Sequence, residues 1–314
     1  MIILGAGMAG CLAGVLDPKA IILEAAPEPT ASHKAVLRFR EDKISKVTGI
    51  PFRPVMVRKA IWLDGREVLP TPRVCNLYSQ KVTGKILDRS IRSIEPVQRF
   101  VAPDDFHLQL AEQCKARIKY NSPVEAISKK HLRVGNGGIG LIERAKDESI
   151  LSTMPMPTLM KLLGIQHREK FDFQPITVTR YKLPGADVFQ TIYFPSPNDS
   201  VYRATMTGDD FIVESVREIS AIDMAVVCEA FGIKQSSLVS VSENVQKYGK
   251  IAPIDDRMRK HMMFTASADF CVYSLGRFAC WRNILLDDVY EDFFKIKRMI
   301  NTTTHYDHKL EALA

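Results

Sequence analysis

A glycine-rich turn near the start of the chain restricts the fold more than any other feature. The apolar run Ile2–Leu4 has the length of a buried parallel strand and leads into GAGMAG at residues 5–10. Small and apolar residues continue to Leu16, and a second apolar run, residues 20–23, ends at Glu24. A strand, turn, helix, strand and acid in this register predict a βαβ unit that binds a dinucleotide.

Each part of this fingerprint has a mechanical reason. The first glycine permits the tight turn, the second lets the backbone approach a pyrophosphate, and the third lets helix and strand pack closely. The helix N-terminus offers free N–H groups to the phosphates. Glu24 suits a ribose hydroxyl and would repel a 2′-phosphate, which argues against NADP. The cofactor contacts expected here are Gly5, Gly7, Met8, Ala9, Gly10, Glu24 and Ala25.

The other end of the chain holds a second candidate phosphate motif. Residues 271–274 are typical of a strand, Gly276 interrupts it, and Arg277 supplies a cation whose planar fork suits phosphate. Apolar residues at a mostly helical spacing then predict a helix over residues 284–298. A purely structural strand, turn and helix with a surface arginine is the alternative interpretation.

Three stretches together resemble the flavoprotein superfamily of amine oxidases, protoporphyrinogen oxidases and UDP-galactopyranose mutases. They are residues 5–10, the paired segments 121–127 and 150–157, and residues 272–290. The resemblance implies FAD as the cofactor, with backbone of the second stretch at the adenine and the last stretch at the pyrophosphate. It also implies that the final helix points its N-terminus at the flavin ring. The further cofactor contacts expected from it are Arg38, Val124, Thr153, Gly276, Arg277, Trp281, Leu286 and Asp287.

The chain departs from this superfamily where Gly-Gly-Arg usually follows the ribose acid. Residues 31–40 have the sequence ASHKAVLRFR, so the glycine pair that approaches the flavin is absent. His33 and Lys34 occupy this place, and a cation there would stabilise a reduced, anionic flavin. A surface loop is the alternative for these two residues, and core filling is the alternative for Trp281.

The two motifs lie at opposite ends of the chain, so one cofactor domain must be built from separated stretches. We expect an α/β fold whose discontinuous Rossmann-type FAD-binding domain comprises residues 1–60, 97–165 and 250–314. An inserted substrate domain then comprises residues 61–96 and 166–249. Within it, β-branched and aromatic runs separated by turn signals predict an antiparallel sheet.

Shorter patterns predict single elements. Residues 62–68 are typical of a hairpin with Asp64 and Gly65 as its turn. Helical spacing of apolar residues predicts helices over residues 106–119, 157–163 and 222–231.

Three residues of the predicted sheet are candidate substrate contacts. Tyr193, Tyr202 and Arg203 could hold a planar or anionic substrate. Alternating strand residues can equally be core and solvent faces. With His33 and Lys34, these three make up the catalytic candidates. A flavin performs the redox step itself, so no catalytic triad is expected, and the sequence shows none.

Cysteine spacing and hydropathy exclude several classes of protein. Six scattered cysteines without a C-x-x-C pair favour a reduced, metal-free chain. No apolar run approaches the ~20 residues that span a bilayer, and the first strand leaves no room for a secretory leader. We therefore expect a cytoplasmic protein without membrane contact, in the host cytoplasm if a virus encodes it. The oligomeric state stays open.

Charge is uneven along the chain. The net charge of +7 arises largely between residues 34 and 59, where eight basic residues stand against two acidic ones. This basic segment is a candidate surface for a polyanion, whether cofactor, nucleotide or nucleic acid. A solvated face that keeps the protein soluble is the alternative.

Together these observations favour an FAD-dependent oxidoreductase that resembles the amine oxidases. It would oxidise a carbon–nitrogen bond of an amine-bearing substrate by hydride transfer to flavin N5. Residues 34–62 and the middle region also resemble small flavoproteins of bacterial viruses, some of which serve hypermodification of DNA bases. An amino-acid-modified pyrimidine in phage DNA is therefore an attractive substrate. The alternatives are a non-redox flavoenzyme of the UDP-galactopyranose mutase type and a non-catalytic flavin- or nucleic-acid-binding protein.

Overall fold

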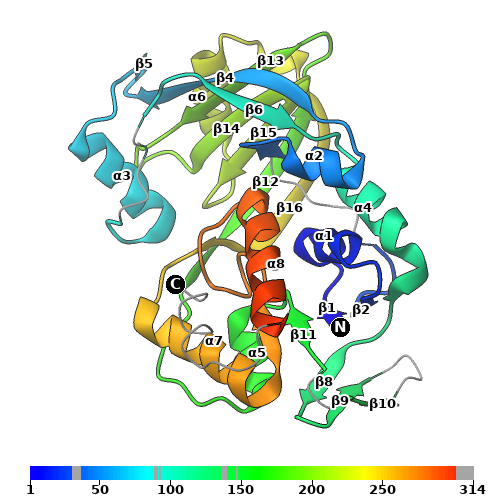
Figure 1. Cartoon of the computed structure of the whole chain (residues 1–314). Coiled ribbons are helices and arrows are strands. Elements are labelled where there is room, and N and C mark those ends of the chain that lie inside the picture. The colour runs from blue at the N-terminus through cyan, green and yellow to red at the C-terminus, as the bar shows by residue number, and fades with distance from the viewer. Residues whose placement is uncertain (30–36, 88–90, 92, 136–139, 146–147, 302–314) are drawn as a thin grey trace.

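Two sheets stacked end to end organise the molecule (Figure 1). The computed structural model describes the chain apart from residues 30–36, 88–90, 92, 136–139, 146–147 and 302–314. One sheet is small and parallel and contains the N-terminal strand, and the other is large and mixed. This arrangement confirms the expected α/β fold with a Rossmann-type sheet and a second sheet beside it.

The parallel sheet has five short strands with helices on both faces. In sheet order they are β17 (Val272–Ser274), β11 (Ile150–Ser152), β1 (Ile2–Leu4), β2 (Ile21–Leu23) and β7 (Ile118–Lys119). One face packs on α1 (Met8–Leu16), α4 (Phe106–Cys114) and α8 (Leu286–Asn301). The other face packs on α5 (Met156–Leu163) and α7 (Asp256–Phe270). Strands covered on both faces explain why these segments are apolar runs without alternation.

The large sheet has nine strands. Its path runs β16 (Val239–Ile251), β12 (Phe173–Lys182), β15 (Asp210–Ser215), β14 (Val201–Gly208), β13 (Val188–Tyr193), β4 (Arg53–Leu63), β6 (Val97–Val101) and β3 (Arg38–Phe39), and β5 (Arg66–Glu67) pairs with β4. Neighbours pair antiparallel as expected, except that β13 pairs parallel with β4. The sheet is therefore mixed, because β4 arrives from a distant part of the chain.

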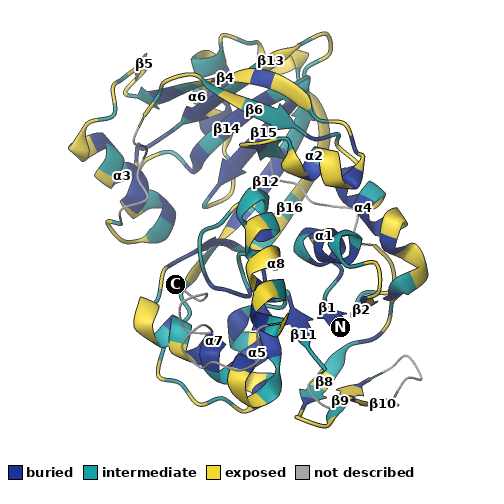
Figure 2. Cartoon of the chain, viewed as in Figure 1, coloured by how far each residue is buried: buried dark blue, intermediate teal, exposed yellow. Residues whose placement is uncertain are grey.

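The faces of the large sheet differ in chemistry. Helix α6 (Ala221–Phe231) covers one face with an apolar cluster that includes Ile192, Met206 and Phe211. Helix α3 (Pro72–Thr83) covers only part of the opposite face. In Figure 2 the central strands β14 and β15 are mostly buried, whereas the helices also carry exposed residues. The opposite face also carries buried polar side chains, which places candidate chemistry there.

Smaller elements complete the described chain. A three-stranded sheet is formed by β8 (Val124–Ile127), β9 (His131–Val134) and β10 (Gly140–Glu143). Helix α2 (Lys43–Thr48) follows β3, and two 3₁₀ turns lie at Lys115–Arg117 and Gln235–Ser237. The expected helix over 106–119 is shorter in the structure, because it ends at Cys114 and the chain then enters β7. The hairpin at Asp64 and Gly65 is confirmed, with positive φ at both turn residues.

The expected domain limits at residues 60 and 97 stay a prediction, but the strand pairing bears on two segments. Residues 53–60 and 97–101 were assigned to the cofactor domain from the sequence. The structure pairs them within β4 and β6 of the large sheet. Strand β4 is continuous from Arg53 to Leu63, so a boundary inside it would divide one element.

Candidate functional site

The predicted cofactor motifs meet at one edge of the parallel sheet. Gly5 follows β1, Glu24 follows β2, Thr153 follows β11, and Gly276 follows β17 after one intervening residue. The strands run parallel, so all four residues lie at the carboxyl edge of the sheet. Ligands of open α/β sheets bind outside this edge.

The three glycines of the fingerprint have different surroundings. Gly5 has φ +96°, and a Cβ atom there would approach the Thr153 hydroxyl to 2.6 Å. A Cβ at Gly10 would overlap the carbonyl oxygen of Gly5, so helix and strand can touch only through a glycine. A Cβ at Gly7 would meet nothing within 4 Å. Gly7 caps the N-terminus of α1, so the turn has open space beside free helix N–H groups, as a pyrophosphate requires.

The C-terminal motif packs directly on this turn. Gly276 has φ +99°, and a Cβ there would lie 3.1 Å from the Cβ of Ala9. Arg277 donates from Nη2 to the carbonyl of Gly249 at 3.1 Å, so part of its guanidinium reaches β16 of the large sheet. The expected pyrophosphate contact of Arg277 stays a prediction. The motif nevertheless links the cofactor edge to the large sheet.

Glu24 holds the fingerprint turn from the neighbouring strand. Its carboxylate accepts the backbone N–H of Ala6 at 2.6 Å and that of Ala26 at 2.8 Å, one on each oxygen. A carboxylate oxygen can accept more than one hydrogen bond, so the group keeps capacity for a ribose hydroxyl. Ala25 is exposed beside it, and Met8 is buried in the first turn of α1.

The N-terminus of α8 lies against the segment between β3 and α2. The Asp287 carboxylate accepts the backbone N–H of Arg40 at 3.1 Å and that of Glu41 at 3.3 Å. Arg40 also pairs with Asp288. The expected flavin contacts Leu286 and Asp287 are thus in the first turn of α8, with the Asp287 side chain engaged by β3–α2 backbone.

The remaining predicted site residues lie on other elements than the strands of the parallel sheet. Arg38 donates to Thr191 Oγ1 at 3.0 Å, to Thr207 Oγ1 at 2.7 Å and to the carbonyl of Met206, which are all residues of the large sheet. Burial, and then the charge of Arg203, lowers the pKa of Arg38 to about 10. The two Nη atoms of Arg38 are thus engaged in the large sheet, and its expected cofactor contact stays a prediction. Val124 lies half-buried on β8, two residues after Ser122, whose N–H donates to the carbonyl of Glu24 at 2.8 Å, and its expected adenine contact stays a prediction. His33 and Lys34 lie outside the described residues.

Two aromatic candidates are internal. Trp281 is 1% exposed, packs among the apolar residues beneath the parallel sheet, and donates its indole N–H to Ala252 at 2.9 Å. This placement corrects cofactor stacking in favour of core filling. Tyr202 is fully buried, and its hydroxyl donates to Glu214 at 2.9 Å. Tyr202 is therefore an internal residue of the large sheet, and its expected substrate contact stays a prediction.

A cavity of about 440 Å³ opens on the polar face of the large sheet. It contains two of the predicted substrate contacts, Tyr193 and Arg203, and its volume falls in the ~300–1,000 Å³ range of small-molecule sites. Elements β4, α3, β13, β14 and β16 contribute to it. The lining residues are Lys59, Tyr78, Ser79, Val82, Thr83, Ile91, Ser93, Tyr193, Arg203 and Lys250.

Arg203 is fixed by a buried acid. It donates from Nη2 to Glu214 at 2.7 Å and from Nε to the other carboxylate oxygen. Burial alone would raise the pKa of Glu214, but the charge and hydrogen bonds of Arg203 hold it below its usual value. The guanidinium fork is thus occupied, and Arg203 meets the cavity as a positioned, largely neutralised group.

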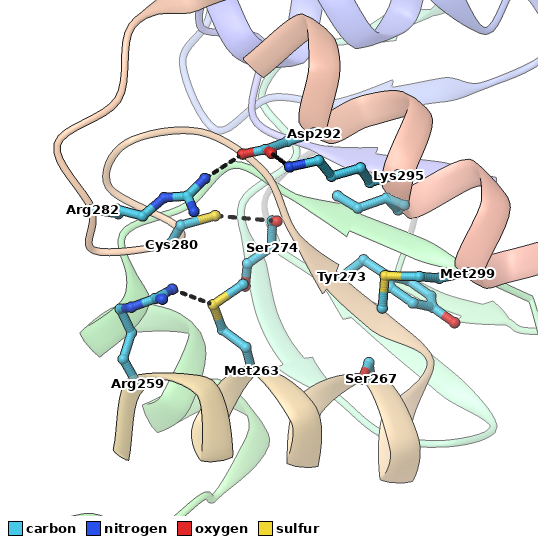
Figure 3. A pocket seen from close by; sticks show the side chains of 11 residues that line it. Arg259, Met263, Ser267, Tyr273, Ser274, Cys280, Arg282, Asp292, Lys295 and Met299 are labelled. Atoms are coloured by element: carbon cyan, nitrogen blue, oxygen red, sulfur yellow. Dashed lines mark hydrogen bonds and ion pairs between the residues drawn. The ribbon is translucent and has the colours of Figure 1, made fainter. Parts of the chain in front are cut away.

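A second, smaller cavity lies between α7, β17 and α8 (Figure 3). Arg259, Cys280, Arg282 and Asp292 surround a space of about 40 Å³, which holds one or two water molecules at most. Burial raises the pKa of Cys280 to about 11, so its thiol stays protonated and unreactive. This cavity is too small for a substrate.

The basic segment does not form one continuous surface. Four of its residues pair with acids: Arg40 with Asp287 and Asp288, Lys43 with Glu41 and Glu291, Lys46 with Asp42, and Arg53 with Asp187. Arg38 is buried in the large sheet, Arg58 is exposed, and Lys59 lines the cavity. The sequence could not show this division, because most of the paired acids lie far away along the chain. It also gave no signal for Tyr78 and Lys250, which only strand pairing and helix packing bring to the cavity.

No group of three His, Cys, Asp or Glu gathers as a metal site among the residues that the structure describes. Within the same residues, no helix is long and apolar enough to cross a bilayer.

The sheet order, the glycine turn and the second sheet define a Rossmann-type α/β fold, which several proteins of known structure share, a flavin-dependent brominase among them. A reduced UDP-galactopyranose mutase has the same fold with a TM-score of 0.74 at 14% identity, covering 100% of this chain and 98% of the other. A geranylgeranyl bacteriochlorophyll reductase-like protein from Thermoplasma acidophilum is similar with a TM-score of 0.61 at 11% identity, covering 99% and 81%. The flavin-dependent brominase Bmp2 matches at 0.57 and 13%, covering 99% and 81%. The sequence itself matches no protein-family model, and no curated protein matches it significantly.

Proposed function

We propose that this chain binds FAD at the carboxyl edge of its parallel sheet and acts as a flavoenzyme. One observation carries the proposal: the turn at Gly5–Gly10 is closed where helix and strand must touch and open over Gly7, at a helix N-terminus. A pyrophosphate fits this opening, and the ribose acid stands beside it as Glu24. The flavin-dependent brominase among the structural neighbours supports a flavin as the cofactor.

The residues of this chain would orient the cofactor. The free N–H groups of α1 would hold the pyrophosphate, and Glu24 would accept from a ribose hydroxyl. Gly276 lets the C-terminal motif approach α1 closely, so that this motif would form one side of the cofactor site. FAD, when bound, supplies a two-electron acceptor that dioxygen can restore.

The reaction proposed first is the oxidation of a carbon–nitrogen bond, as in the amine oxidases. The finer proposal is an amine carried by a modified pyrimidine of DNA, in the cytoplasm of an infected cell. Lys59, which belongs to the basic segment and lines the cavity, supports an anionic substrate of this kind. Arg58 is the residue of that segment that is exposed without a described ion pair.

The second candidate reaction is non-redox chemistry of the UDP-galactopyranose mutase type. Two observations favour it. The similarity to that enzyme extends over nearly the full length of both chains. The cavity also presents lysine and arginine side chains, which suit a diphosphate.

An absorbance spectrum of the purified full chain tests the cofactor, because bound flavin has two visible bands. Anaerobic mixing with candidate amines then tests the reaction. An oxidase bleaches these bands and consumes dioxygen when air is admitted. A mutase turns over a nucleotide sugar only after the flavin is reduced. Bound flavin that no candidate bleaches, with no turnover after reduction, would favour a non-catalytic flavin-binding protein.

A further inference from the structure

The described lining of the 440 Å³ cavity is positively charged. Of its described lining residues, Lys59, Arg203 and Lys250 are cationic and none is acidic. Glu214, behind the lining, compensates Arg203 through two hydrogen bonds. The charge of Lys250 also lowers the pKa of Glu214, so this one carboxylate lies near two of the three cations.

Lys59 is the third cation of this lining. It lies half-buried on β4, and no carboxylate forms an ion pair with it in the part of the chain that the structure describes. Burial, and then the nearby charge of Arg99, lowers its pKa. A partly buried cation without a counter-charge is costly for the fold unless a ligand supplies one.

Lys250 lies on the edge strand β16, which four strands separate from β4 in the order of the sheet. Its side chain is held with Nζ 4.5 Å from the ring centroid of Tyr202, and the residue is 9% exposed. A buried ammonium over an aromatic ring has a fixed direction. Lys59 and Lys250 therefore present charge from two strands that the chain could bring together only by tertiary folding.

The strand that carries Lys250 also contacts the C-terminal motif at the carboxyl edge of the parallel sheet. The residue before Lys250 is Gly249, whose carbonyl accepts the Arg277 guanidinium. Arg277 directly follows Gly276, which touches the fingerprint helix. Strand β16, which carries Lys250, is therefore hydrogen-bonded to the C-terminal motif through the neighbouring residue Gly249.

We propose that this cavity binds an oxyanion of the substrate, a phosphate or a carboxylate, between Lys59 and Lys250. Tyr78 and Tyr193, whose rings contact edge to face at 5.5 Å, would flank the rest of the molecule. The proposal deepens the proposed function, on which it rests for the reaction performed at the neighbouring edge. It assigns substrate recognition to Lys59 and Lys250, with Arg203 as a positioning residue.

Titration calorimetry on the full chain as purified tests the site with matched pairs of probes. Thymidine 5′-monophosphate against thymidine tests a phosphate, and N-acetylglycine against its methylamide tests a carboxylate. We expect one anionic member to bind and its neutral partner to bind at least about 10-fold more weakly. Binding of the monophosphate would identify the oxyanion as a phosphate, and binding of N-acetylglycine would identify it as a carboxylate.

Variants assign the binding to the cavity. Lys59→Ala should weaken the anion about 10- to 100-fold, the range of a lost charged hydrogen bond, and Lys59→Arg should restore most of it. Lys46→Ala is the matched control, because that lysine belongs to the same basic segment but pairs with Asp42 at the surface. It should bind the probe as the parent chain does.

Flavin content, read from the same samples, separates this inference from the proposed function. If neither anion binds, or if Lys59→Ala binds as tightly as the parent, the oxyanion site is refuted even when the flavin is present. If the chain holds no flavin but the anion binds and Lys59→Ala loses it, the site stands and the proposed function falls.

Discussion

The two sheets of this molecule prepare a site in different ways. The parallel sheet has strands of two or three residues, and what it presents at its edge is mostly backbone: glycines, helix N–H groups and one carboxylate. The large sheet has strands of up to 13 residues, and it presents charged side chains from one face. The parallel sheet offers a ligand open space beside backbone groups, and the large sheet offers it charged side chains.

This difference predicts opposite sensitivities. At the parallel sheet, adding atoms should be harmful, because two glycines already touch neighbouring atoms and a third faces open space. At the large sheet, removing charge should be harmful, because the Arg203–Glu214 pair is buried and its partners depend on each other.

The largest effect should follow from filling the open space. Gly7→Val should fold and yet purify without FAD, because its side chain occupies the position that a pyrophosphate needs. The absorbance spectrum measures flavin content. The free energy of unfolding, measured with denaturant, should differ by no more than about 1 kcal/mol between the Gly7→Val variant and the flavin-free parent chain.

Gly10→Val is the matched contrast to that variant. Its Cβ would overlap the carbonyl of Gly5, so we expect destabilisation of about 3 kcal/mol or more. If Gly7→Val kept stoichiometric flavin, or if both variants were equally unstable, the division of roles among the glycines would be wrong.

The next effect concerns the large sheet. Glu214→Gln should lower the free energy of unfolding by about 3 kcal/mol, because it leaves Arg203 partly buried without its counter-charge. The pKa of Glu214 is lowered in the fold, so its stabilisation is present above the unfolded value of 4.5 and is lost as pH falls through the folded value. Unfolding curves from pH 7 to pH 3 should therefore converge for parent and variant. Parallel curves would show that the pair does not control this acid response.

A smaller effect should follow from removing the ribose acid. Glu24→Ala should weaken FAD binding by roughly 1.5–3 kcal/mol, the range for hydrogen bonds to a charged group. Part of this loss would come from the fingerprint turn, whose Ala6 N–H loses its acceptor. Flavin fluorescence on dilution measures the affinity, and unchanged affinity would remove Glu24 from the ribose site.

The smallest effect is expected on the basic segment. Lys46 is exposed and pairs with Asp42 one helical turn away, so Lys46→Ala should change the free energy of unfolding by at most about 0.5 kcal/mol. We also expect no change in the salt dependence of any DNA binding. A slope shallower by about one unit would instead assign Lys46 to a phosphate contact.

The sequence could predict which residues gather at the carboxyl edge of the parallel sheet, because its parts are local or are fixed by strand order. Residues 2–24 form one βαβ unit, and the position of each glycine follows from backbone geometry alone. Thr153 and Gly276 could be expected at the same edge because parallel strands share their carboxyl ends. The exception, Trp281, carries a large side chain whose direction depends on neighbours distant in sequence.

The sequence by itself determined the Rossmann-type unit, the glycine spacing and the existence of a second, strand-rich region. Only the tertiary structure decided where charge is free and where it is paired. Arg203 is neutralised by Glu214, the basic segment is divided among several acids, and Lys59 meets Lys250 across a cavity. The physical reason is range: backbone conformation is set within a few residues, whereas the net charge at a point depends on every strand and helix that packs around it.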